Sequence, residues 1–336
     1  MKNVLYIGNN LAGKAHNVSY IKILGGLLEQ EGYTLYYASS QTHKLLRLLD
    51  MLFHVIRLRC KVDVVLIDTY STQNFYYAYA VSQLCRWLQL DYIPILHGGN
   101  LPARLESHPK LSSALFNHAK HIVSPSLYLK EAFETNGYKP IVHIPNTVQL
   151  HNYTFQSRTY ETLRLLWVRS FSKIYNPQLA IHVFQAIKKR YPDATLCMVG
   201  PDSDGSLVEV QELAKELDVD VEFTGKLSKS EWISRSQDFN IFINTTNFDN
   251  TPVSVIEAMA LGLPVVSTNV GGMPYLISNN VDGLLVAPNQ INEMVDAIVR
   301  LKQDESLRQQ IVKNARSKVE KFDWKVVKPK WDALLS

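Results

Sequence analysis

Residues 249–264 have the sequence Asp-Asn-Thr-Pro-Val-Ser-Val-Ile-Glu-Ala-Met-Ala-Leu-Gly-Leu-Pro and follow an apolar run that ends at Ile243. Asn250 and Thr251 are residue types that cap helices, Pro252 suits the first helical turn, and the segment ends with a Gly-Leu-Pro stop. It therefore predicts a helix with Asp249 just before its N-terminus and Glu257 inside it. A helix N-terminus attracts anions, and carboxylates accept hydrogen bonds from hydroxyl groups. The corner suits a phosphorylated sugar, although a capped amphipathic helix with a charged entrance has the same local pattern.

The composition predicts a globular chain long enough for two domains. The chain has 336 residues, of which 46% are hydrophobic and 20% charged, with a formal net charge of +4. The first residues enter a strand without the apolar core of a signal peptide, and no apolar run approaches the roughly 18 residues of a membrane span. Cys60, Cys85 and Cys197 form no close pair, which favours a reducing compartment. We expect a cytoplasmic protein without a nucleic-acid partner.

Strand and helix patterns alternate along the whole chain. Short runs rich in Val, Ile and Tyr are separated by segments with helical periodicity, and the series occurs twice. This predicts an α/β fold with two Rossmann-like parallel-sheet domains, residues 1–150 and 151–321, joined by a hinge in the polar stretch 145–159. The expected strands are 4–7, 34–38, 62–67, 92–96, 121–123 and 141–143 in the first series, and 163–168, 195–199, 221–223, 239–243 and 265–267 in the second.

The turn after the first strand has two interpretations. Residues 8–15, Gly-Asn-Asn-Leu-Ala-Gly-Lys-Ala, match the phosphate-binding loop of NTPases except at the last position, and the apolar run before Asp68 is similar to their metal-binding strand. Ala15 lacks the hydroxyl group that ligates magnesium in such loops. A P-loop NTPase is therefore the weaker alternative, and a turn with Gly13 close to a diphosphate is the stronger one.

Two Asp-x-Asp triplets are candidate metal ligands because carboxylates bind hard cations. The triplet 218–220 comes before a strand, so a solvated turn explains it. Asp202 and Asp204 follow the strand 195–199, but the glycines at 200 and 205 indicate a flexible loop. We expect no metal site, and Asp202 with Asp204 stays the alternative.

Two basic residues follow the first strand of the second series, and a histidine ends a strand of the first. Arg169 offers a planar fork of donors and Lys173 a mobile point charge, and together they can neutralise a leaving diphosphate without a metal. His97 precedes Gly98 and Gly99, which let the backbone approach a ligand closely. The alternatives are a solvated basic surface and a histidine bonded to its neighbouring loop.

These segments resemble retaining GT-B glycosyltransferases of family 4, the glycosyl transferases group 1. The stretch 249–264 is similar to the family's Glu-x7-Glu signature, with Asp249 in place of the first Glu and Asn-Thr-Pro in place of Gly-Phe-Gly. The run 168–174 resembles the family's Gly-Arg-x4-Lys-Gly, without its two glycines and with a shorter interval between Arg and Lys. Three further segments are similar to the family. Residues 144–148 resemble its hinge, 223–227 its base-binding turn and 270–274 the loop after its signature.

The resemblance implies a role for each candidate residue. Arg169 and Lys173 would contact the diphosphate of the donor. Asp249 and His97 would contact the transferred sugar, and Glu257 the ribose hydroxyls. The further donor-binding residues that it implies are Gly13, Gly200, Gly225, Lys226, Asn250, Thr251 and Val253.

The resemblance also implies the reaction. It implies a metal-independent retaining glycosyltransferase of hexosyl or N-acetylhexosaminyl type. A sugar would pass from a nucleoside-diphosphate sugar to a glycan, lipid-linked or other hydroxyl acceptor, in polysaccharide or glycoconjugate biosynthesis. The domain 1–150, together with a crossover helix at 322–336, would bind the acceptor, and the domain 151–321 the donor. A sugar-nucleotide epimerase on the same fold and a non-catalytic subunit that binds nucleotide sugars are the alternatives.

Residues 43–61 concentrate positive charge. They contain five Lys or Arg residues and one Asp, so this segment alone carries as much net charge as the whole chain. Leucines and other apolar residues alternate with the basic ones, a pattern typical of helices that lie on anionic membranes. One interpretation is peripheral contact with the inner face of a membrane. The alternative is an ordinary helix packed on a sheet with basic residues on its outer side.

Overall fold

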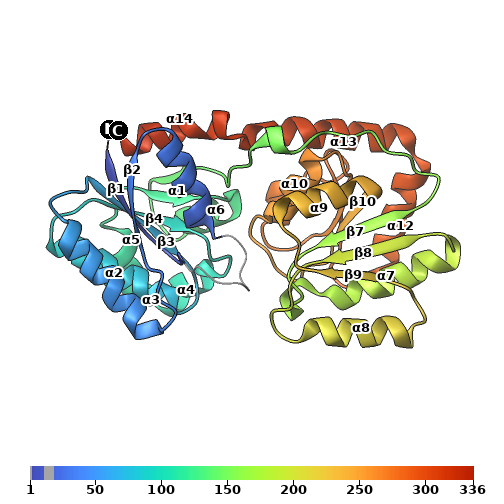
Figure 1. The fold of residues 1–336 in the computed structure, drawn as a ribbon, viewed down its shortest axis with the longest axis horizontal. Coiled ribbons are helices and arrows are strands. Elements are labelled where there is room, and N and C mark those ends of the chain that lie inside the picture. Colours follow the sequence, from blue (N-terminus) through green and yellow to red (C-terminus); the bar gives the residue numbers. More distant parts are fainter. Residues whose placement is uncertain (1, 11–18) are drawn as a thin grey trace. The chain divides into compact units, whose positions relative to one another are not determined.

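The structure, a computed structural model, describes residues 2–10 and 19–336 (Figure 1). The chain divides into two compact units, Met1–Thr147 with Val327–Ser336 and Val148–Val326, which we call the first and second units. Each unit contains a six-stranded parallel sheet with helices around it. The predicted α/β class with two parallel-sheet domains is therefore confirmed. Gly13 lies outside the described residues.

The first unit has a sheet with the strand order β2-β1-β3-β4-β5-β6. Its central strands are apolar runs buried on both faces, as expected for a parallel sheet covered by helices. The strands are β1 (Asn3–Ile7), β2 (Thr34–Ala38), β3 (Val64–Thr69), β4 (Tyr92–Leu96), β5 (Ile122–Ser124) and β6 (Ile141–His143). The helices are α1 (Tyr20–Gln30), α2 (Lys44–Leu58), α3 (Asn74–Trp87), α4 (Leu101–Ser107), α5 (Pro109–Phe116) and α6 (Leu127–Thr135), followed at the end of the chain by α14 (Trp324–Leu335).

The second unit has a sheet with the strand order β12-β11-β10-β7-β8-β9. The strands are β7 (Arg164–Val168), β8 (Thr195–Val199), β9 (Glu222–Gly225), β10 (Ile241–Asn244), β11 (Val265–Thr268) and β12 (Leu284–Val286). The helices are α7 (Pro177–Arg190), α8 (Ser206–Glu216), α9 (Lys229–Arg235), α10 (Val253–Ala260), α11 (Met273–Leu276), α12 (Ile291–Gln303) and α13 (Glu305–Val319). No helix in the described ranges combines the length and apolarity needed to cross a membrane.

Alternating side chains of β7 hold the core of the second unit together. Leu165 and Trp167 belong to a buried cluster that contains Phe184 of α7, and Leu166 belongs to another that contains Val255 of α10. Successive side chains of a strand point to opposite faces, so helices cover this sheet on both sides. Such a strand cannot slip by one residue without exchanging its two buried faces.

Strand register decides which loops meet at the carboxyl edge of each sheet. Val168 of β7 pairs with Val199 of β8, so Arg169 and Gly200 leave the sheet side by side. In the first unit, Asp68 near the end of β3 pairs with β4. Ligands of parallel α/β folds bind at this edge because all strands point towards it.

The start of α10 differs from the prediction. Asn250 and Thr251 were expected to cap the helix and Pro252 to lie in its first turn. Instead, Pro252 is the N-cap residue, no side chain caps the helix, and the helix begins at Val253. Residues before a proline are driven into extended conformations, which keeps the preceding stretch out of the helix.

Candidate active site

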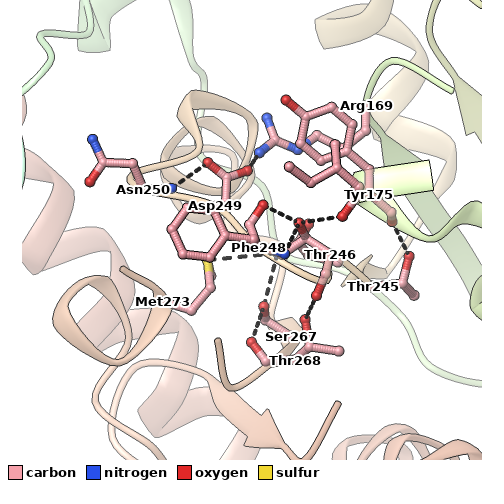
Figure 2. Close-up of polar contacts among 12 residues, drawn as sticks. Arg169, Tyr175, Thr245, Thr246, Phe248, Asp249, Asn250, Ser267, Thr268 and Met273 are labelled. Atoms are coloured by element: carbon pink, nitrogen blue, oxygen red, sulfur yellow. Dashed lines mark hydrogen bonds and ion pairs between the residues drawn. The ribbon is translucent and has the colours of Figure 1, made fainter. Parts of the chain in front are cut away.

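The second unit brings Arg169 and Asp249 together at the carboxyl edge of its sheet. Arg169 follows β7 and Asp249 follows β10, which are neighbours in the sheet. The Arg169 guanidinium forms an ion pair with Asp249 Oδ2, and the side chains are only 15% and 14% exposed. The Tyr175 ring lies 4.4 Å from Arg169 Cζ and covers one face of the guanidinium, as Figure 2 shows. The predicted diphosphate and sugar contacts are therefore adjacent.

Burial changes the electrostatics of this pair. Burial lowers the pKa of the Arg169 guanidinium, and the neighbouring Tyr175 acts in the opposite direction. An arginine starts from such a high pKa that it stays charged near neutral pH. The pair therefore places a full positive charge beside a carboxylate at a site with little solvent exposure. The electrostatic attraction between this cation and an anionic ligand is strong there.

Two glycines hold the backbone of Asp249 in place. The Gly272 N–H donates to the Asp249 carbonyl oxygen at 2.8 Å. A Cβ at Gly272 would lie 1.7 Å from the Asn250 carbonyl oxygen, and one at Gly271 would lie 2.3 Å from that of Asp249. The loop before α11 thus packs directly on the peptide groups around Asp249. The sequence showed the loop 270–274 but gave no sign of this contact.

A network of hydroxyl groups supports the loop after β10 that carries Asp249 (Figure 2). Thr246 Oγ1 donates to the Phe248 carbonyl oxygen at 2.8 Å, and Thr268 Oγ1 donates to the Thr246 carbonyl oxygen at 2.6 Å. The Asn250 N–H donates to Asp249 Oδ1 at 2.8 Å. Satisfied buried polar groups stiffen a loop, so the carboxylate of Asp249 is held in one position.

We expect Gly272→Ala to damage this corner. The added methyl group would collide with backbone atoms, so the free energy of unfolding should fall by about 1–3 kcal/mol and donor affinity should fall with it. Gly26→Ala is the matched control, because a Cβ there meets nothing within 4 Å and the residue lies in helix α1. That change should raise stability slightly. Urea denaturation of both variants tests the prediction, and equal stability would contradict it.

Lys173 forms its contacts outside the ion pair of Arg169 and Asp249. Its side chain is 73% exposed, and Nζ lies 3.5 Å from Glu209 Oε1 on α8. Its backbone N–H donates to Asp204 Oδ2 at 3.0 Å at the start of a short 3-10 helix, Lys173–Tyr175. The structure therefore brings Arg169 and Asp249 together but gives the Lys173 ammonium another partner.

The carboxylates of Asp202 and Asp204 accept hydrogen bonds from neighbouring backbone and hydroxyl groups. Asp204 accepts hydrogen bonds from Ser172 Oγ at 2.8 Å and from Ser206 N at 3.2 Å, and such bonds, that from Ser206 Oγ first, lower the pKa of Asp204 to about 2. Asp202 Oδ1 accepts from the Gly205 N–H at 3.0 Å. Within the described part of the chain, no three His, Cys, Asp or Glu side chains form a metal-binding group. Both carboxylates act as local caps at the start of α8.

Glycines bring β7, β8 and β9 close together beside Arg169. A Cβ at Gly200 would lie 1.7 Å from the Arg169 carbonyl oxygen, and the Gly200 N–H donates to the Gly225 carbonyl oxygen at 2.9 Å. Gly225 has φ +68°, a conformation that favours glycine. Lys226 is exposed immediately after it. The predicted donor residues Gly200, Gly225 and Lys226 therefore follow one another along the edge that carries Arg169.

Glu257 occupies the inner side of α10. It is 3% exposed, and its Oε1 accepts a hydrogen bond from Tyr153 Oη at 2.6 Å. Lys229 of α9 forms an ion pair with the same oxygen. Burial and then the Glu257 carboxylate raise the pKa of Tyr153. Tyr153 and Lys229 were missed from the sequence, because neither lies in a motif and only folding brings them to Glu257.

The remaining predicted donor residues frame the start of α10. Asn250, Thr251 and Val253 are each partly exposed, in contrast to the wholly buried second half of the helix. Ser254 Oγ is buried and has no hydrogen-bond partner among the described residues. The first turn of α10 thus offers backbone N–H groups, which suit an anionic ligand.

The first unit holds His97 through a buried carboxylate. His97 Nε2 lies 2.9 Å from Asp68 Oδ1, and these side chains are 9% and 1% exposed. Tyr6 Oη donates to the same oxygen at 3.0 Å, and burial, followed by the Asp68 charge, raises the pKa of Tyr6. The rings of Tyr20 and Tyr70 lie 4.8 and 5.4 Å from the His97 ring. Asp68, which the NTPase interpretation assigned to a metal, instead orients a histidine.

Gly8 makes this arrangement possible. A Cβ at Gly8 would lie 2.5 Å from Asp68 Oδ2, so a larger residue would displace the carboxylate. In the tautomer whose Nε2–H donates a hydrogen bond to Asp68, Nδ1 is left as an acceptor for a hydroxyl group. The glycine pattern that resembled a phosphate-binding loop therefore has, at Gly8, a packing explanation.

Two parallel-sheet α/β units are the architecture of the GT-B class of glycosyltransferase folds. Residues 154–318 match the family model "Glycosyl transferases group 1". The second unit is similar to this family along almost its whole length.

Relatives and solved structures agree with the class. An uncharacterized glycosyltransferase of Haemophilus influenzae is 28% identical over 61% of this chain and 57% of its own length. Sucrose-phosphate synthase from Thermosynechococcus elongatus has a TM-score of 0.82 and 17% identity, covering 99% of this chain and 98% of that one. Anabaena HepE, solved with UDP and glucose, has a TM-score of 0.80 and 16% identity over 100% and 99% of the two chains. The chain matches between 29% and 57% of the length of three curated relatives.

Proposed function

We propose that the chain is a retaining glycosyltransferase that moves a sugar from a nucleoside-diphosphate sugar to a hydroxyl acceptor. The observation that carries the proposal is the buried ion pair of Arg169 and Asp249. A nucleotide sugar carries an anionic diphosphate next to a ring of hydroxyl groups. The pair offers a cation for the first and a carboxylate for the second, a few ångströms apart.

The steps follow from these charges. The bond between the sugar and the diphosphate breaks, and the leaving diphosphate gains charge, which Arg169 and a reoriented Lys173 stabilise. The acceptor hydroxyl oxygen then bonds to the sugar carbon on the face from which the diphosphate departs, and its proton passes to the departing diphosphate oxygen. Asp249 and Glu257 bind sugar and ribose hydroxyls and are not assigned a proton-transfer role. The same proposal assigns His97 to the transferred sugar.

The finer identity is part of the same proposal. We propose a hexosyl or N-acetylhexosaminyl donor and a glycan or lipid-linked acceptor, in polysaccharide or glycoconjugate biosynthesis. The donor binds the second unit and the acceptor the first. We place the protein in the cytoplasm, and the three free cysteines, of which Cys85 and Cys197 are buried, support a reducing compartment.

A donor screen tests the proposal. UDP-, GDP- and ADP-sugars are each added during thermal unfolding, and a true donor at a hundred times its Kd should stabilise the protein by about 2.7 kcal/mol. The donor that stabilises should then release its nucleoside diphosphate when an acceptor is added. Binding without release would indicate a non-catalytic subunit, and turnover of UDP-GlcNAc without an acceptor would indicate an epimerase. No stabilisation by any sugar nucleotide would overturn the proposal.

Activity should survive EDTA. Arg169 and Lys173 can supply positive charge at the diphosphate, while Asp202 is hydrogen-bonded to Gly205 and Asp204 to the backbone of Lys173. Initial rates measured with and without EDTA should therefore agree within the error of the assay. Loss of activity with EDTA, restored by magnesium, would return the Asp-x-Asp loop to the mechanism.

We expect Asp68→Asn to reduce turnover about tenfold or more by changing how His97 is held. An amide binds the imidazole less strongly than a carboxylate and permits the other tautomer. Nitrogen chemical shifts of the His97 ring measure the tautomer directly. Tyr6→Phe is the control, since it removes one hydrogen bond to Asp68 but leaves the bond to His97. Normal turnover with a changed tautomer would remove His97 from the reaction.

A further inference from the structure

Helix α2 has apolar side chains on two opposite sides. Its inner side packs on the first unit through buried residues that include Met51, Val55 and Leu58. Its outer side exposes a set of large apolar side chains, which we call the α2 stripe. The stripe consists of Leu45 (68% exposed), Leu46 (54%), Leu49 (61%), Phe53 (56%) and Ile56 (49%).

The stripe is continuous and unusual within this protein. With about 3.6 residues per turn, residues three and four apart lie side by side on a helix, so Leu45, Leu49, Phe53 and Ile56 form one row. Among the described residues, no other helix exposes more than two large apolar side chains. Contiguous exposed apolar patches mark interaction sites, because water is excluded from them only when a partner binds.

Basic residues border the stripe. Lys44, Arg57, Arg59 and Lys61 are exposed, and the only acidic residue of the segment, Asp50, pairs with His54. Arg47 does not contribute to this surface. Arg47, the fifth basic residue of the segment, is buried. It donates to the Gln41 carbonyl oxygen at 2.8 Å and to Asn9 Oδ1 at 3.2 Å.

An exposed aromatic residue ends the helix that packs against α2. Helices α2 and α3 each follow a parallel strand and pack against each other, so their C-termini point to the same end of the sheet (Figure 1). Trp87, the last residue of α3, is 78% exposed. Tryptophan is the side chain most typical of the boundary between lipid and water.

We propose that the α2 stripe docks on the surface of an anionic lipid bilayer. An amphipathic helix of this kind lies in the plane of the membrane, with its apolar side among the acyl chains and its basic residues at the headgroups. Charge complementarity selects this occupant over a second copy of the chain. A symmetric dimer through the stripe would bring two identical basic borders together, and like charges repel. The inference goes beyond glycosyl transfer and does not depend on it.

Vesicle co-sedimentation of the full chain tests the proposal. The protein should sediment with mixed phosphatidylglycerol–phosphatidylcholine vesicles at low salt and should leave them at high salt, where the attraction is screened. Vesicles of phosphatidylcholine alone should bind it weakly. Changing Arg57, Arg59 and Lys61 together to Glu should weaken binding at least about a hundredfold. Phe53→Ser with Leu49→Ser should also weaken binding, without any change of charge.

Matched controls separate this surface from general effects. Changing Lys189, Lys215 and Lys313 to Glu alters the net charge equally but on exposed positions of the second unit, and it should leave vesicle binding nearly unchanged. Val208→Ser removes a 56% exposed apolar side chain of α8 and serves as the control for the serine variants. Thermal unfolding of each variant confirms folding, and its stabilisation by the donor shows whether donor binding is affected separately.

Three results would overturn the proposal. The first is absence of the wild-type protein from the vesicle pellet at low salt. The second is equal binding of the wild type and both α2 variants. The third is a concentration-dependent dimer, seen by analytical ultracentrifugation, that Phe53→Ser dissociates, since the stripe would then be covered by a second copy.

Discussion

Arg169→Ala is expected to lower kcat about 10² to 10³-fold, because one lost contact to developing charge commonly costs that much. The guanidinium is buried against Tyr175 and paired with Asp249. Water therefore cannot readily replace the electrostatic stabilisation that its charge provides. Release of nucleoside diphosphate under saturating donor measures the effect. Lys173→Ala should act in the same direction, provided that its ammonium leaves Glu209 when the donor binds.

A double variant separates the catalytic role of Arg169 from its structural role. Arg169→Ala leaves the Asp249 carboxylate without its partner, which should lower the free energy of unfolding by up to about 3 kcal/mol. Arg169→Met combined with Asp249→Asn removes both charges and should recover much of that loss while turnover stays low. Arg235→Ala, which breaks exposed pairs with Glu222 and Asp238, should change neither quantity much. Recovery of turnover in the double variant would assign Arg169 to stability alone.

Substitutions of Asp249 should rank by the carboxylate that they retain. Asp249→Ala is expected to lose about 10²-fold or more in kcat, because both the sugar contact and the partner of Arg169 disappear. Asp249→Glu should keep part of the activity. Its carboxylate is longer, but Gly271 and Gly272 hold the backbone, so it has to reach Arg169 through a different rotamer. Initial rates under saturating donor give the ranking.

Further variants separate the roles of the carboxylates of Asp249 and Glu257. Asp249→Asn keeps the shape and one acceptor oxygen but removes the charge, so it separates hydrogen bonding from electrostatics. Glu257→Gln should weaken donor binding less than Glu257→Ala, since the amide can still accept the bond from Tyr153. An Asp249→Ala variant with wild-type turnover would leave Asp249 as a structural partner of Arg169 only.

The candidate residues could be found from the sequence because they follow buried strands. Arg169 follows the apolar run of β7, and His97 follows that of β4, while Asp249 lies a few residues beyond β10. The carboxyl ends of parallel strands meet at one edge, so residues that come after such runs gather there. Lys173 shows the limit of this argument. It has the right position after β7, yet the loop turns its side chain towards Glu209 on α8.

Partners that lie far apart in the chain were not predictable. Tyr153 and Glu257 are 104 residues apart, and nothing local marks the tyrosine as a ligand of a buried carboxylate. In the sequence, Asp68 ends an apolar run, as the Asp of a metal-binding strand does. No residue near it in the chain is marked as another partner for its carboxylate. The register of β3 and β4 supplies that partner, His97.

The sequence by itself determined the alternation of strands and helices, the α/β class with two parallel sheets, and the identity of the segments at their edges. Hydrophobic periodicity and helix-stop residues are local properties, so they need no knowledge of the fold. Only the tertiary structure decided which charges pair and which apolar residues are covered. In α2 the leucines look equivalent in sequence, yet Leu58 is buried while Leu49 is exposed. Burial depends on where the sheet lies, and that position is set by the packing of the whole unit.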